Sequence, residues 1–469
     1  MGTAAIGTAE RPLRVAIVGS GPSGLYAAEA LLSSTAPICS CDVFDRMPAP
    51  FGLVRCGVAP DHQNIKKVIA AYEKTINRAA FRFFGGVKLG QHLTVDDLRA
   101  CYDAIIYAVG CESDTKLGIP GEDLPGVHSA TEFVGWYNGH PDHVNNKFNL
   151  GVEAALVAGV GNVSMDVSRI LARTADELAV YDMPAYAIET LRRDLKVKTI
   201  HVVGRRGPEQ ANFSPKEIKE LGHLENADLV LKQENIHLPE ALPEIGKADV
   251  EVVQNLQYLA QKMKEPLAGK PRQIVLHFLL SPLEFQAGPD GRLARVKMER
   301  NALVKDAQGN VKARGTGEIM YIDAGLVFKA VGYRGKPVPG VPFDERKGHI
   351  PNDAGRVLKD AKDTQTVPGQ YVVGWAKRGP SGLIGTNKGD SIATVQALLA
   401  DFKAGTLPVT TLADPNAVQS ILSDRKVAYV SYADWKRIDA AEIARGKSAN
   451  KIREKFLSIE EMFKAAGQP

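Results

Sequence analysis

Two glycine-rich turns in this chain have the residue types and the spacing that bind nucleotide phosphates. The first, Gly19-x-Gly21-x-x-Gly24, follows the apolar run Val15–Val18 and opens a small-residue helical pattern. In such a turn the first glycine permits the bend, the second lets backbone approach a pyrophosphate, and the third lets a helix pack on the strand. The free N–H groups at the helix N-terminus then face the phosphates. The turn predicts a dinucleotide site.

The second turn, Gly159-x-Gly161-x-x-Ser164, lies between the apolar run of "ALVAGVG" and the helical pattern of "NVSMDVSRIL". Serine replaces the third glycine, and its small side chain still permits close packing. A chain with two such units is expected to hold two nucleotides. Two nucleotides face to face indicate hydride transfer between a nicotinamide and a flavin.

The residues that end the next strand of each unit differ in charge. The strand after the first turn ends on Asp45, whose carboxylate can accept hydrogen bonds from both ribose hydroxyls, as FAD requires. The strand Thr199–Val203 after the second turn runs into Gly204 and then Arg205 and Arg206. Charge-assisted bonds to a phosphate contribute about 1.5–3 kcal/mol each, so two arginines could favour NADPH over NADH by about a hundredfold. The alternative is a pair of exposed arginines in a turn.

Composition narrows the class of protein. The 469 residues exceed what one core usually serves, so we expect two domains. No run approaches the ~18 apolar residues of a membrane helix, and a net charge of +4 is too small to indicate nucleic-acid binding. The five cysteines form no C-x-x-C pair, so neither a redox dithiol nor a metal site is expected. The first ten residues lack the features of a targeting signal and are interpreted as a loose tail.

Further elements are expected along the chain. Apolar runs in Tyr102–Ser113 and Ala324–Gly335 indicate strands, and a helix is expected from about Gln63 with Asp61 as its N-cap. The long interval between Ser164 and the strand at Thr199 indicates a helical insertion. The tail Leu407–Pro469 should form short amphipathic helices. Its basic residues are interpreted as a solvated face: Arg437, Arg445, Lys447, Lys451, Arg453 and Lys455.

Several longer motifs make the chain resemble the adrenodoxin reductase family of ferredoxin–NADP reductases. These motifs are "VAIVGSGPSGLYAAE", "PFGLVRCGVAPDHQNIKKV", "GVGNVSMDVSRIL", "GRRGPEQANFSPKEIKE" and "GWAKRGPSGLIGTNKGD". The resemblance implies an α/β fold of two Rossmann-like, three-layer nucleotide-binding domains with glutathione-reductase-like topology. It implies an FAD domain from residues 1–113 and 340–469, with an NADP domain of residues 114–339 inserted into it.

The resemblance also implies an activity and its residues. NADPH passes a hydride to FAD, which releases single electrons to an acidic [2Fe–2S] or other ferredoxin. The implied FAD-binding residues are Gly19, Gly21, Pro22, Ser23, Gly24, Asp45, Gly52, Leu53, Val87, Gly374, Trp375, Gly382, Leu383 and Ile384. The implied NADP-binding residues are Val160, Gly161, Asn162, Val163, Arg205, Arg206, Glu217 and Gly382.

A second group of side chains is implied near the reacting rings. His62 and Glu220 match a pair that assists hydride transfer or proton traffic, although His62 alone could be a solvated first-turn histidine. Glu217 and Glu220 lie three apart on one helical face, so Glu217 is expected to orient the arginines and Glu220 to face the flavin. Trp375 offers a flat face to the flavin, and "KGDSIATV" is expected to present a helix N-terminus to it.

Other classes remain open from the residues alone. A flavin disulfide reductase would need a dithiol, and the small subunit of glutamate synthase carries cysteine clusters that are absent before Cys39. A monooxygenase, a quinone reductase and a colourless NADP sensor are further alternatives. The lysine-leaning segment Ala260–Gln273 leaves the docking face for an acidic ferredoxin undefined. We expect a monomer, in the cytoplasm if bacterial and in the mitochondrial matrix if eukaryotic.

Overall fold

The computed structural model of the chain describes residues 5–236, 238, 249–408, 410–412 and 414–468. The chain forms two compact units. Unit 1 comprises Met1–Ser113, Asn138–Pro141 and Tyr333–Pro469, and unit 2 comprises Asp114–Tyr137 and Asp142–Gly332. The chain returns to unit 1 at Tyr333, earlier than the expected residue 340. The two-residue strands β5 (Ser113–Asp114) and β15 (Tyr333–Arg334) lie where the chain passes from one unit to the other.

Unit 1 is built on a seven-stranded sheet with the order β16-β17-β18-β4-β1-β2-β3. The strands β18, β4, β1, β2 and β3 are parallel, and β17 and β16 continue the sheet antiparallel. Every residue of β1 is buried, as expected for a central parallel strand covered on both faces. The strand bounds are β1 (Leu13–Val18), β2 (Cys39–Asp45), β3 (Phe81–Gly85), β4 (Ala104–Tyr107), β16 (Asn352–Asp353), β17 (Arg356–Leu358) and β18 (Thr366–Val372).

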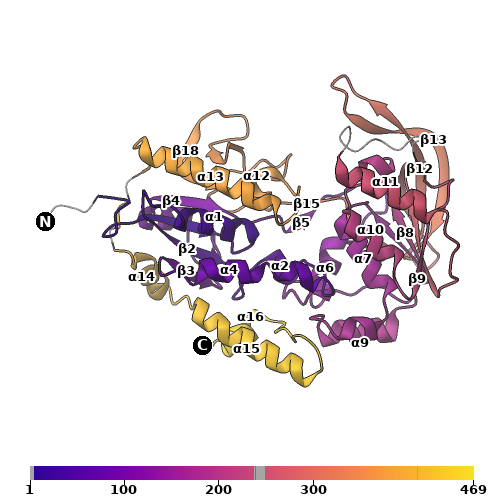
Figure 1. Cartoon of the computed structure of the whole chain (residues 1–469), viewed down its shortest axis with the longest axis horizontal. Coiled ribbons are helices and arrows are strands. Elements are labelled where there is room, and N and C mark those ends of the chain that lie inside the picture. The colour runs from indigo at the N-terminus through magenta and orange to yellow at the C-terminus, as the bar shows by residue number, and fades with distance from the viewer. Residues whose placement is uncertain (1–4, 237, 239–248, 409, 413, 469) are drawn as a thin grey trace. The chain divides into compact units, whose positions relative to one another are not determined.

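Helices cover both faces of this sheet, which gives three layers (Figure 1). On one face Val15 and Ile17 of β1 pack with Leu25 of the helix that follows, and on the other Val18 packs in a cluster with Leu98. The helices of unit 1 are α1 (Pro22–Leu32), α2 (Leu53–Cys56), α3 (Gln63–Lys66), α4 (Ile69–Ile76), α5 (Val95–Cys101), α12 (Trp375–Arg378), α13 (Thr386–Lys403), α14 (Ala417–Asp424), α15 (Tyr432–Ser448) and α16 (Ile459–Ala465).

Unit 2 contains a six-stranded parallel sheet with the order β6-β14-β7-β8-β10-β9. Its strands are β6 (Val127–Ser129), β7 (Ala154–Ala158), β8 (Thr199–Val203), β9 (Ala227–Val230), β10 (Arg272–His277) and β14 (Leu326–Lys329). Its helices are α6 (Ala130–Tyr137), α7 (Asn162–Ala172), α8 (Ala175–Ala179), α9 (Ala185–Asp194), α10 (Pro215–Gly222) and α11 (Val250–Lys262), with the 3₁₀ turn η1 (Pro208–Gln210).

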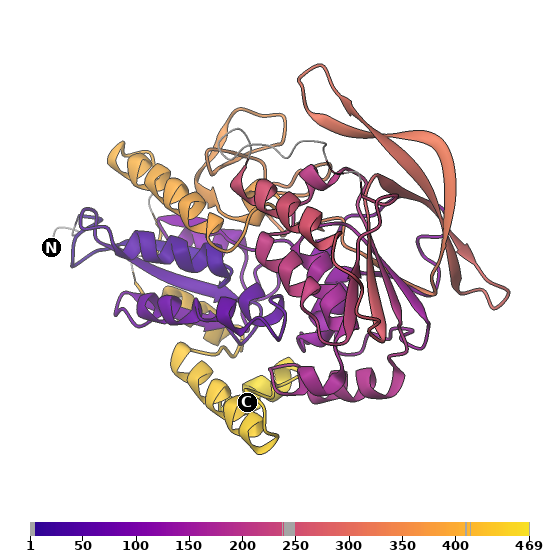
Figure 2. The same cartoon turned by 45° about the vertical axis from the view of Figure 1, so that its right-hand side comes forward.

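A three-stranded antiparallel sheet forms the third layer of unit 2. It comprises β11 (Leu280–Ala287), β12 (Leu293–Lys305) and β13 (Val311–Asp323) in that order. Val296 and Met298 of β12 pack with Leu156 of β7 and Val203 of β8, so the two sheets share a core. The outer halves of β12 and β13 continue as a long ribbon that projects from the unit (Figure 2). No local sequence pattern predicted this sheet.

The structure confirms the two Rossmann-like units and corrects the expected N-cap of one helix. The strand–turn–helix pairs β1–α1 and β7–α7 form where expected, β2 ends on Asp45, and β8 spans Thr199–Val203. Asp61 is not the N-cap of the following helix, because α3 begins after His62 and has no side-chain cap. Among the described helices, none is long and apolar enough to cross a lipid bilayer.

The basic residues of the tail do not all form a solvated face. Lys455 is 1% exposed, and its ammonium donates to the carbonyls of Arg55 and Asn138, both at 3.0 Å. Arg453 pairs with Asp439 and with the fully buried Glu442. Charge alone therefore misled the prediction, because these cations bond inside unit 1.

Candidate functional sites

The first glycine turn lies between β1 and α1 in unit 1. Gly19 has φ +112°, and a Cβ there would lie 2.3 Å from the carbonyl oxygen of Ala108. At Gly21 a Cβ would meet only the Cα of Gly52, at 4.0 Å, so space is open beside the backbone. Gly21 is also the N-cap of α1 and has no side chain to cap the helix. The turn thus leaves N–H groups and room for a pyrophosphate.

Asp45 is held at the end of β2 by its neighbours. One carboxylate oxygen accepts from the Ser20 N–H at 2.9 Å and from the Ser20 hydroxyl at 2.5 Å, and the other accepts from the Met47 N–H at 2.9 Å. A carboxylate accepts about four hydrogen bonds, so capacity for a ribose hydroxyl is left. Burial raises the pKa of Asp45, with the bonds from Ser20 and Met47 opposing it.

The segment around α12 and the start of α13 has the features of a flavin cradle. The Trp375 indole nitrogen is buried and has no hydrogen-bond partner among the described residues, and its ring lies 5.2 Å from that of Tyr333. Space is open beside Gly385, the N-cap of α13, and beside Gly389 in its first turn. Gly374, with φ +68°, donates its N–H to Asp390 at 2.7 Å. An unsatisfied indole N–H and open glycines fit a large cofactor with polar edges such as FAD.

The other residues expected at FAD differ in exposure. Leu53, the first residue of α2, is 36% exposed, and Leu383 is 52% exposed. Val87 is buried, and its N–H donates to the carbonyl of Asp45 at 2.8 Å. His62 is buried in unit 1 as the N-cap of α3, whereas Glu220 lies on α10 of unit 2. Their association stays a prediction.

The second glycine turn lies between β7 and α7 in unit 2. Apart from its chain neighbours, no described residue has an atom within 4 Å of where a Cβ on Gly161 would sit, and Gly161 is the N-cap of α7. Ser164, at the third position, is fully buried, and its hydroxyl lacks a partner among the described residues. Asn162 accepts from the Ser214 N–H at 2.9 Å, and the Asn212 N–H donates to the carbonyl of Val160 at 2.9 Å. These bonds tie the turn to the segment that precedes α10.

Arg205 and Arg206 stand at the carboxyl end of β8. Arg205 is exposed and Arg206 is half-buried, and in the described parts of the chain neither guanidinium has an acidic partner. The Gly159 N–H donates to the carbonyl of Val203 at 2.8 Å, so the glycine turn and the arginines lie at the same sheet edge. Two adjacent unpaired guanidiniums beside an open helix N-terminus suit a phosphate.

Glu217 does not orient these arginines, contrary to the expectation. It is 4% exposed and bonds the guanidinium of Arg169 on α7 at 3.1 Å. Arg169 is fully buried and also bonds Asp166 at 2.6 Å, with Glu220 at 3.7 Å. Sequence reasoning missed Arg169, although its i,i+3 spacing from Asp166 was a local signal. Arg169 thus joins α7 to α10, the two helices that carry the expected NADP contacts.

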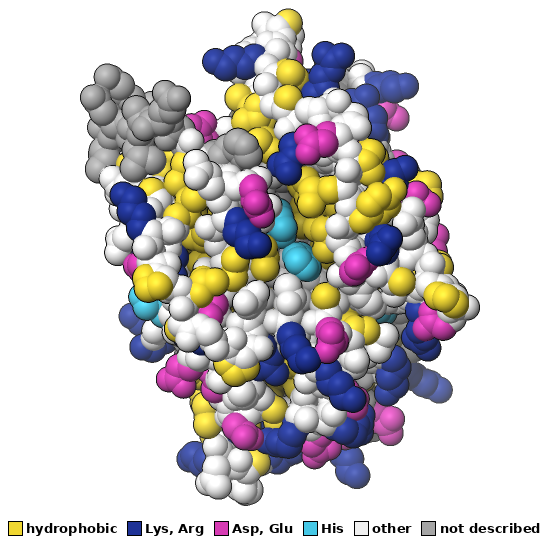
Figure 3. Space-filling view, turned by 90° about the vertical axis from the view of Figure 1, so that its right-hand side faces the viewer, with side chains coloured by type: hydrophobic (Ala, Val, Ile, Leu, Met, Phe, Trp, Pro, Cys, Tyr) yellow, Lys and Arg dark blue, Asp and Glu magenta, His cyan; other side chains and the backbone are white. Residues whose placement is uncertain are grey.

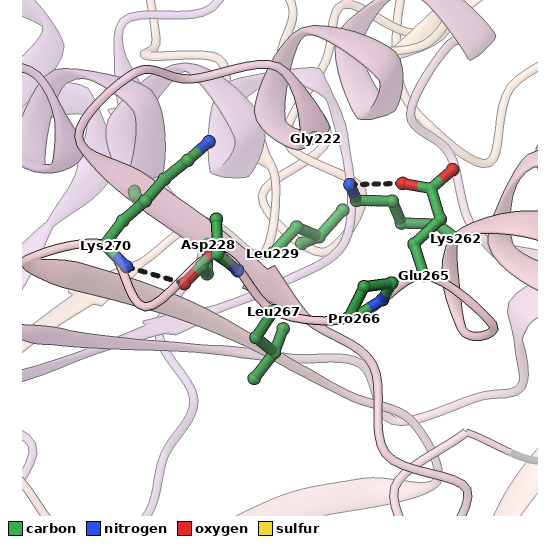
Figure 4. A pocket seen from close by; sticks show the side chains of 10 residues that line it. Gly222, Asp228, Leu229, Lys262, Glu265, Pro266, Leu267 and Lys270 are labelled. Atoms are coloured by element: carbon green, nitrogen blue, oxygen red, sulfur yellow. Dashed lines mark hydrogen bonds and ion pairs between the residues drawn. The ribbon is translucent and has the colours of Figure 1, made fainter.

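The lysine-leaning segment Ala260–Gln273 borders a small cleft of about 50 Å³ (Figure 4). Lys262 pairs with Glu265 at 2.7 Å, and the Lys270 ammonium donates to the carbonyl of Leu224 at 2.6 Å. Asp228 accepts from the Lys270 N–H at 2.9 Å. Lys262 and Lys270 of this segment therefore bond to residues of unit 2 and are not available to an acidic partner protein.

The fold and its two turns define a class: an oxidoreductase with two Rossmann-like units, in one of which the strand after the glycine turn ends on an acid and in the other of which that strand is followed by two arginines. The family described as NAD(P)-binding Rossmann-like domain matches residues 17–86. The chain is 41% identical to NADPH-ferredoxin reductase FprA of Mycobacterium tuberculosis over 464 residues, which is 97% of this chain and 99% of the relative. It is 39% identical to human mitochondrial NADPH:adrenodoxin oxidoreductase, over 98% of this chain and 93% of that protein.

A solved structure extends the likeness to three dimensions. The structure of Mycobacterium tuberculosis FprA in complex with NADPH matches with a TM-score of 0.90 and 40% identity, over 97% of this chain and 100% of that one. The chain belongs to the adrenodoxin reductase-like family of ferredoxin–NADP(+) reductases.

Proposed function

We propose that this chain is an FAD-containing oxidoreductase that takes a hydride from NADPH and delivers single electrons to an iron–sulfur ferredoxin. FAD supplies the conversion of a two-electron donor into one-electron steps. The relatives named NADPH-ferredoxin reductase and NADPH:adrenodoxin oxidoreductase support this activity. The bacterial relatives at about 40% identity support a cytoplasmic location, and a monomer is part of the proposal.

The observation that carries the proposal is the contrast between the two strand ends. Asp45 ends β2 in unit 1, and a carboxylate suits the free ribose hydroxyls of FAD. Arg205 and Arg206 follow β8 in unit 2 without an acidic partner among the described residues, and they suit the 2′-phosphate of NADPH. Unit 1 is therefore the FAD unit and unit 2 the NADPH unit.

The remaining roles follow the same division. In unit 1 the α1 N-terminus receives the pyrophosphate of FAD, and Trp375 and the start of α13 receive the flavin. In unit 2 the α7 N-terminus, with Gly161 and Asn162, receives the pyrophosphate of NADPH. Arg169 bonds Glu217 and fixes it between α7 and α10. His62 and Glu220 are proposed as the pair that assists hydride or proton movement.

The test of the phosphate site is the double substitution Arg205→Ala with Arg206→Ala. Steady-state reduction of a one-electron acceptor should lose efficiency with NADPH by about a hundredfold, while efficiency with NADH changes little, because NADH lacks the phosphate. Arg192→Ala is a matched control, since Arg192 is an exposed arginine of the same unit paired with Asp176. Equal losses with NADPH and NADH would overturn the phosphate assignment.

A flavin disulfide reductase is not favoured. The five cysteines are free in the described structure, and four of them are buried. Burial raises the pKa of Cys39 and of Cys101 to about 11 and that of Cys111 to about 12. Such thiols are poor nucleophiles at neutral pH.

A further inference from the structure

The loop that carries the two arginines is fixed through its backbone carbonyls. This arginine loop, Gly204–Gly207, joins β8 to η1. The carbonyl of Gly204 accepts from the Leu280 N–H at 3.0 Å, and that of Arg206 accepts from the Leu279 N–H at 3.1 Å. The carbonyl between them, that of Arg205, accepts from a side chain, the Asn301 amide, at 2.9 Å.

Leu279 occupies an unusual conformation that makes this bonding possible. Its φ is +56°, a left-handed value that is unfavourable for a leucine and persists only where the surroundings impose it. The bend turns the N–H groups of both Leu279 and Leu280 toward the arginine loop. The carbonyl of Leu279 in turn accepts from the Asn301 N–H at 2.8 Å. Asn301 therefore stabilises the bend through its backbone and the loop through its side chain.

Asn301 lies on β12, far from the nucleotide motifs in sequence. It is 6% exposed and follows a register shift between Glu299 and Asn301 in the β12–β13 pairing. Its amide nitrogen donates to the Arg205 carbonyl and, at 2.8 Å, to the hydroxyl of Ser281. Two residues further along β12, the Leu303 side chain lies 3.4 Å from where a Cβ on Gly207 would sit. The antiparallel sheet thus lies against the arginine loop and holds it through Asn301.

We infer that Asn301 is a positioning residue that determines the preference of the chain for NADPH over NADH. Guanidiniums on long side chains without an acidic partner depend on the backbone for their placement. A loop whose central carbonyl is held by Asn301 presents Arg205 and Arg206 together to one phosphate. The inference rests on the proposed phosphate site and adds a residue that touches neither phosphate nor hydride.

The test substitutes Asn301→Leu, which keeps the branched shape of the side chain, although leucine is larger, and removes the donor, in the FAD-loaded protein. Dissociation constants for 2′,5′-ADP and for 5′-AMP separate phosphate recognition from the rest of the nucleotide. We expect binding of 2′,5′-ADP to weaken about tenfold and that of 5′-AMP by less than about twofold. The KM for NADPH should rise by a similar factor, with kcat at saturating NADPH unchanged.

Ser281→Ala is the matched control, because it removes the other acceptor of the Asn301 amide and leaves the bond to Arg205. It should change neither dissociation constant. Should Asn301→Leu fail to accumulate as a folded flavoprotein, Asn301→Ser gives the same test, because its hydroxyl is too short to reach the Arg205 carbonyl.

Two results overturn the inference. One is wild-type binding of 2′,5′-ADP by the Asn301 variants, and the other is an equal loss for both ligands, which would make Asn301 merely structural. If the Arg205→Ala, Arg206→Ala protein loses its NADPH preference while the Asn301 variants keep theirs, the inference fails and the proposed function stands. If the arginine variant keeps its preference, the proposed phosphate site fails first.

Discussion

At the scale of single residues, function depends on how each charge is partnered. Asp45 is fixed by Ser20 and Met47, whereas Arg205 and Arg206 have no acidic partner among the described residues. A charge that is already paired with an opposite charge in the protein, such as that of Arg169 with Glu217 and Asp166, stabilises the fold. The unneutralised guanidiniums are the ones available to a ligand.

Two histidines of unit 2 give a prediction of pH dependence. His201 on β8 and His277 on β10 lie with ring nitrogens 3.1 Å apart. Burial lowers the pKa of His201 to about 4. The pKa of His277 is lowered to about 3 by burial and, to a lesser extent, by the nearby His201, Lys232 and Arg300. In the unfolded chain a histidine gains its proton near pH 6.5. As the pH falls from 6.5 toward 4, the unfolded chain binds more protons, so stability falls by up to about 1.4 kcal/mol per pH unit for each histidine.

His277→Gln removes one of these titrating groups. The fall in unfolding midpoint between pH 7 and pH 5 should therefore be smaller in this variant than in the parent chain, as followed by circular dichroism. Gln273→Ala, at an exposed neutral residue of the same strand, should leave the fall unchanged, because it removes no titrating group. An undiminished fall in His277→Gln would show that the pair does not titrate as the structure indicates.

At the scale of elements, helix α15 stabilises the short helix α2 that begins with Leu53. Glu442 of α15 is fully buried and bonds both terminal nitrogens of Arg55 on α2, at 2.9 and 2.5 Å. It also bonds Arg453 at 2.8 Å and the Phe456 N–H at 3.0 Å. Burial opposes its charge, but Arg55 and Arg453 keep the pKa of Glu442 below its usual value.

Substituting Glu442→Gln should weaken the FAD unit. Arg55 would lose the carboxylate of Glu442, and breaking such a buried ion pair costs about 3–5 kcal/mol. Helix α2 begins with the expected FAD contact Leu53, and its N-cap is the expected contact Gly52. The variant should therefore release its flavin at a lower temperature on heating, which is seen as a rise in flavin fluorescence. Glu73→Gln is the control, since Glu73 pairs with Lys436 at the surface, where a pair contributes about 0–1 kcal/mol. Equal shifts in both variants would contradict the stabilising role of the buried Glu442–Arg55 pair.

The elements that sequence could predict are those with local signals. The units β1–α1–β2 and β7–α7 have buried apolar runs, glycine turns and helical periodicity within a few tens of residues. The sheet β11–β13 was missed because much of β13 is exposed and lacks an apolar face. The roles of Asn301 and of Lys455 depend on partners distant in sequence, Arg205 for one and Arg55 for the other. No local pattern contains such pairings.

At the scale of the whole molecule, membership of the family gives the activity but not the docking face. On the face near β12 and β13 in Figure 3, basic and acidic side chains are intermingled rather than gathered in one basic patch. Cations of β12 are paired as well, Arg295 with Asp323 and Arg300 with Glu318. The described residues of this face therefore offer no concentrated positive charge to an acidic ferredoxin.

The central claim is that NADPH reduces the flavin of this chain and that ferredoxin then removes the electrons singly. Anaerobic stopped-flow mixing tests it most directly, with the FAD-loaded protein, NADPH or NADH, and ferredoxins encoded by the same organism. We predict that the flavin absorption bleaches much faster with NADPH than with NADH, and that the reduced protein then reduces two ferredoxins for each NADPH oxidised. Bleaching at equal rates with both nucleotides, or a reduced flavin that passes electrons to none of these ferredoxins, would contradict the account.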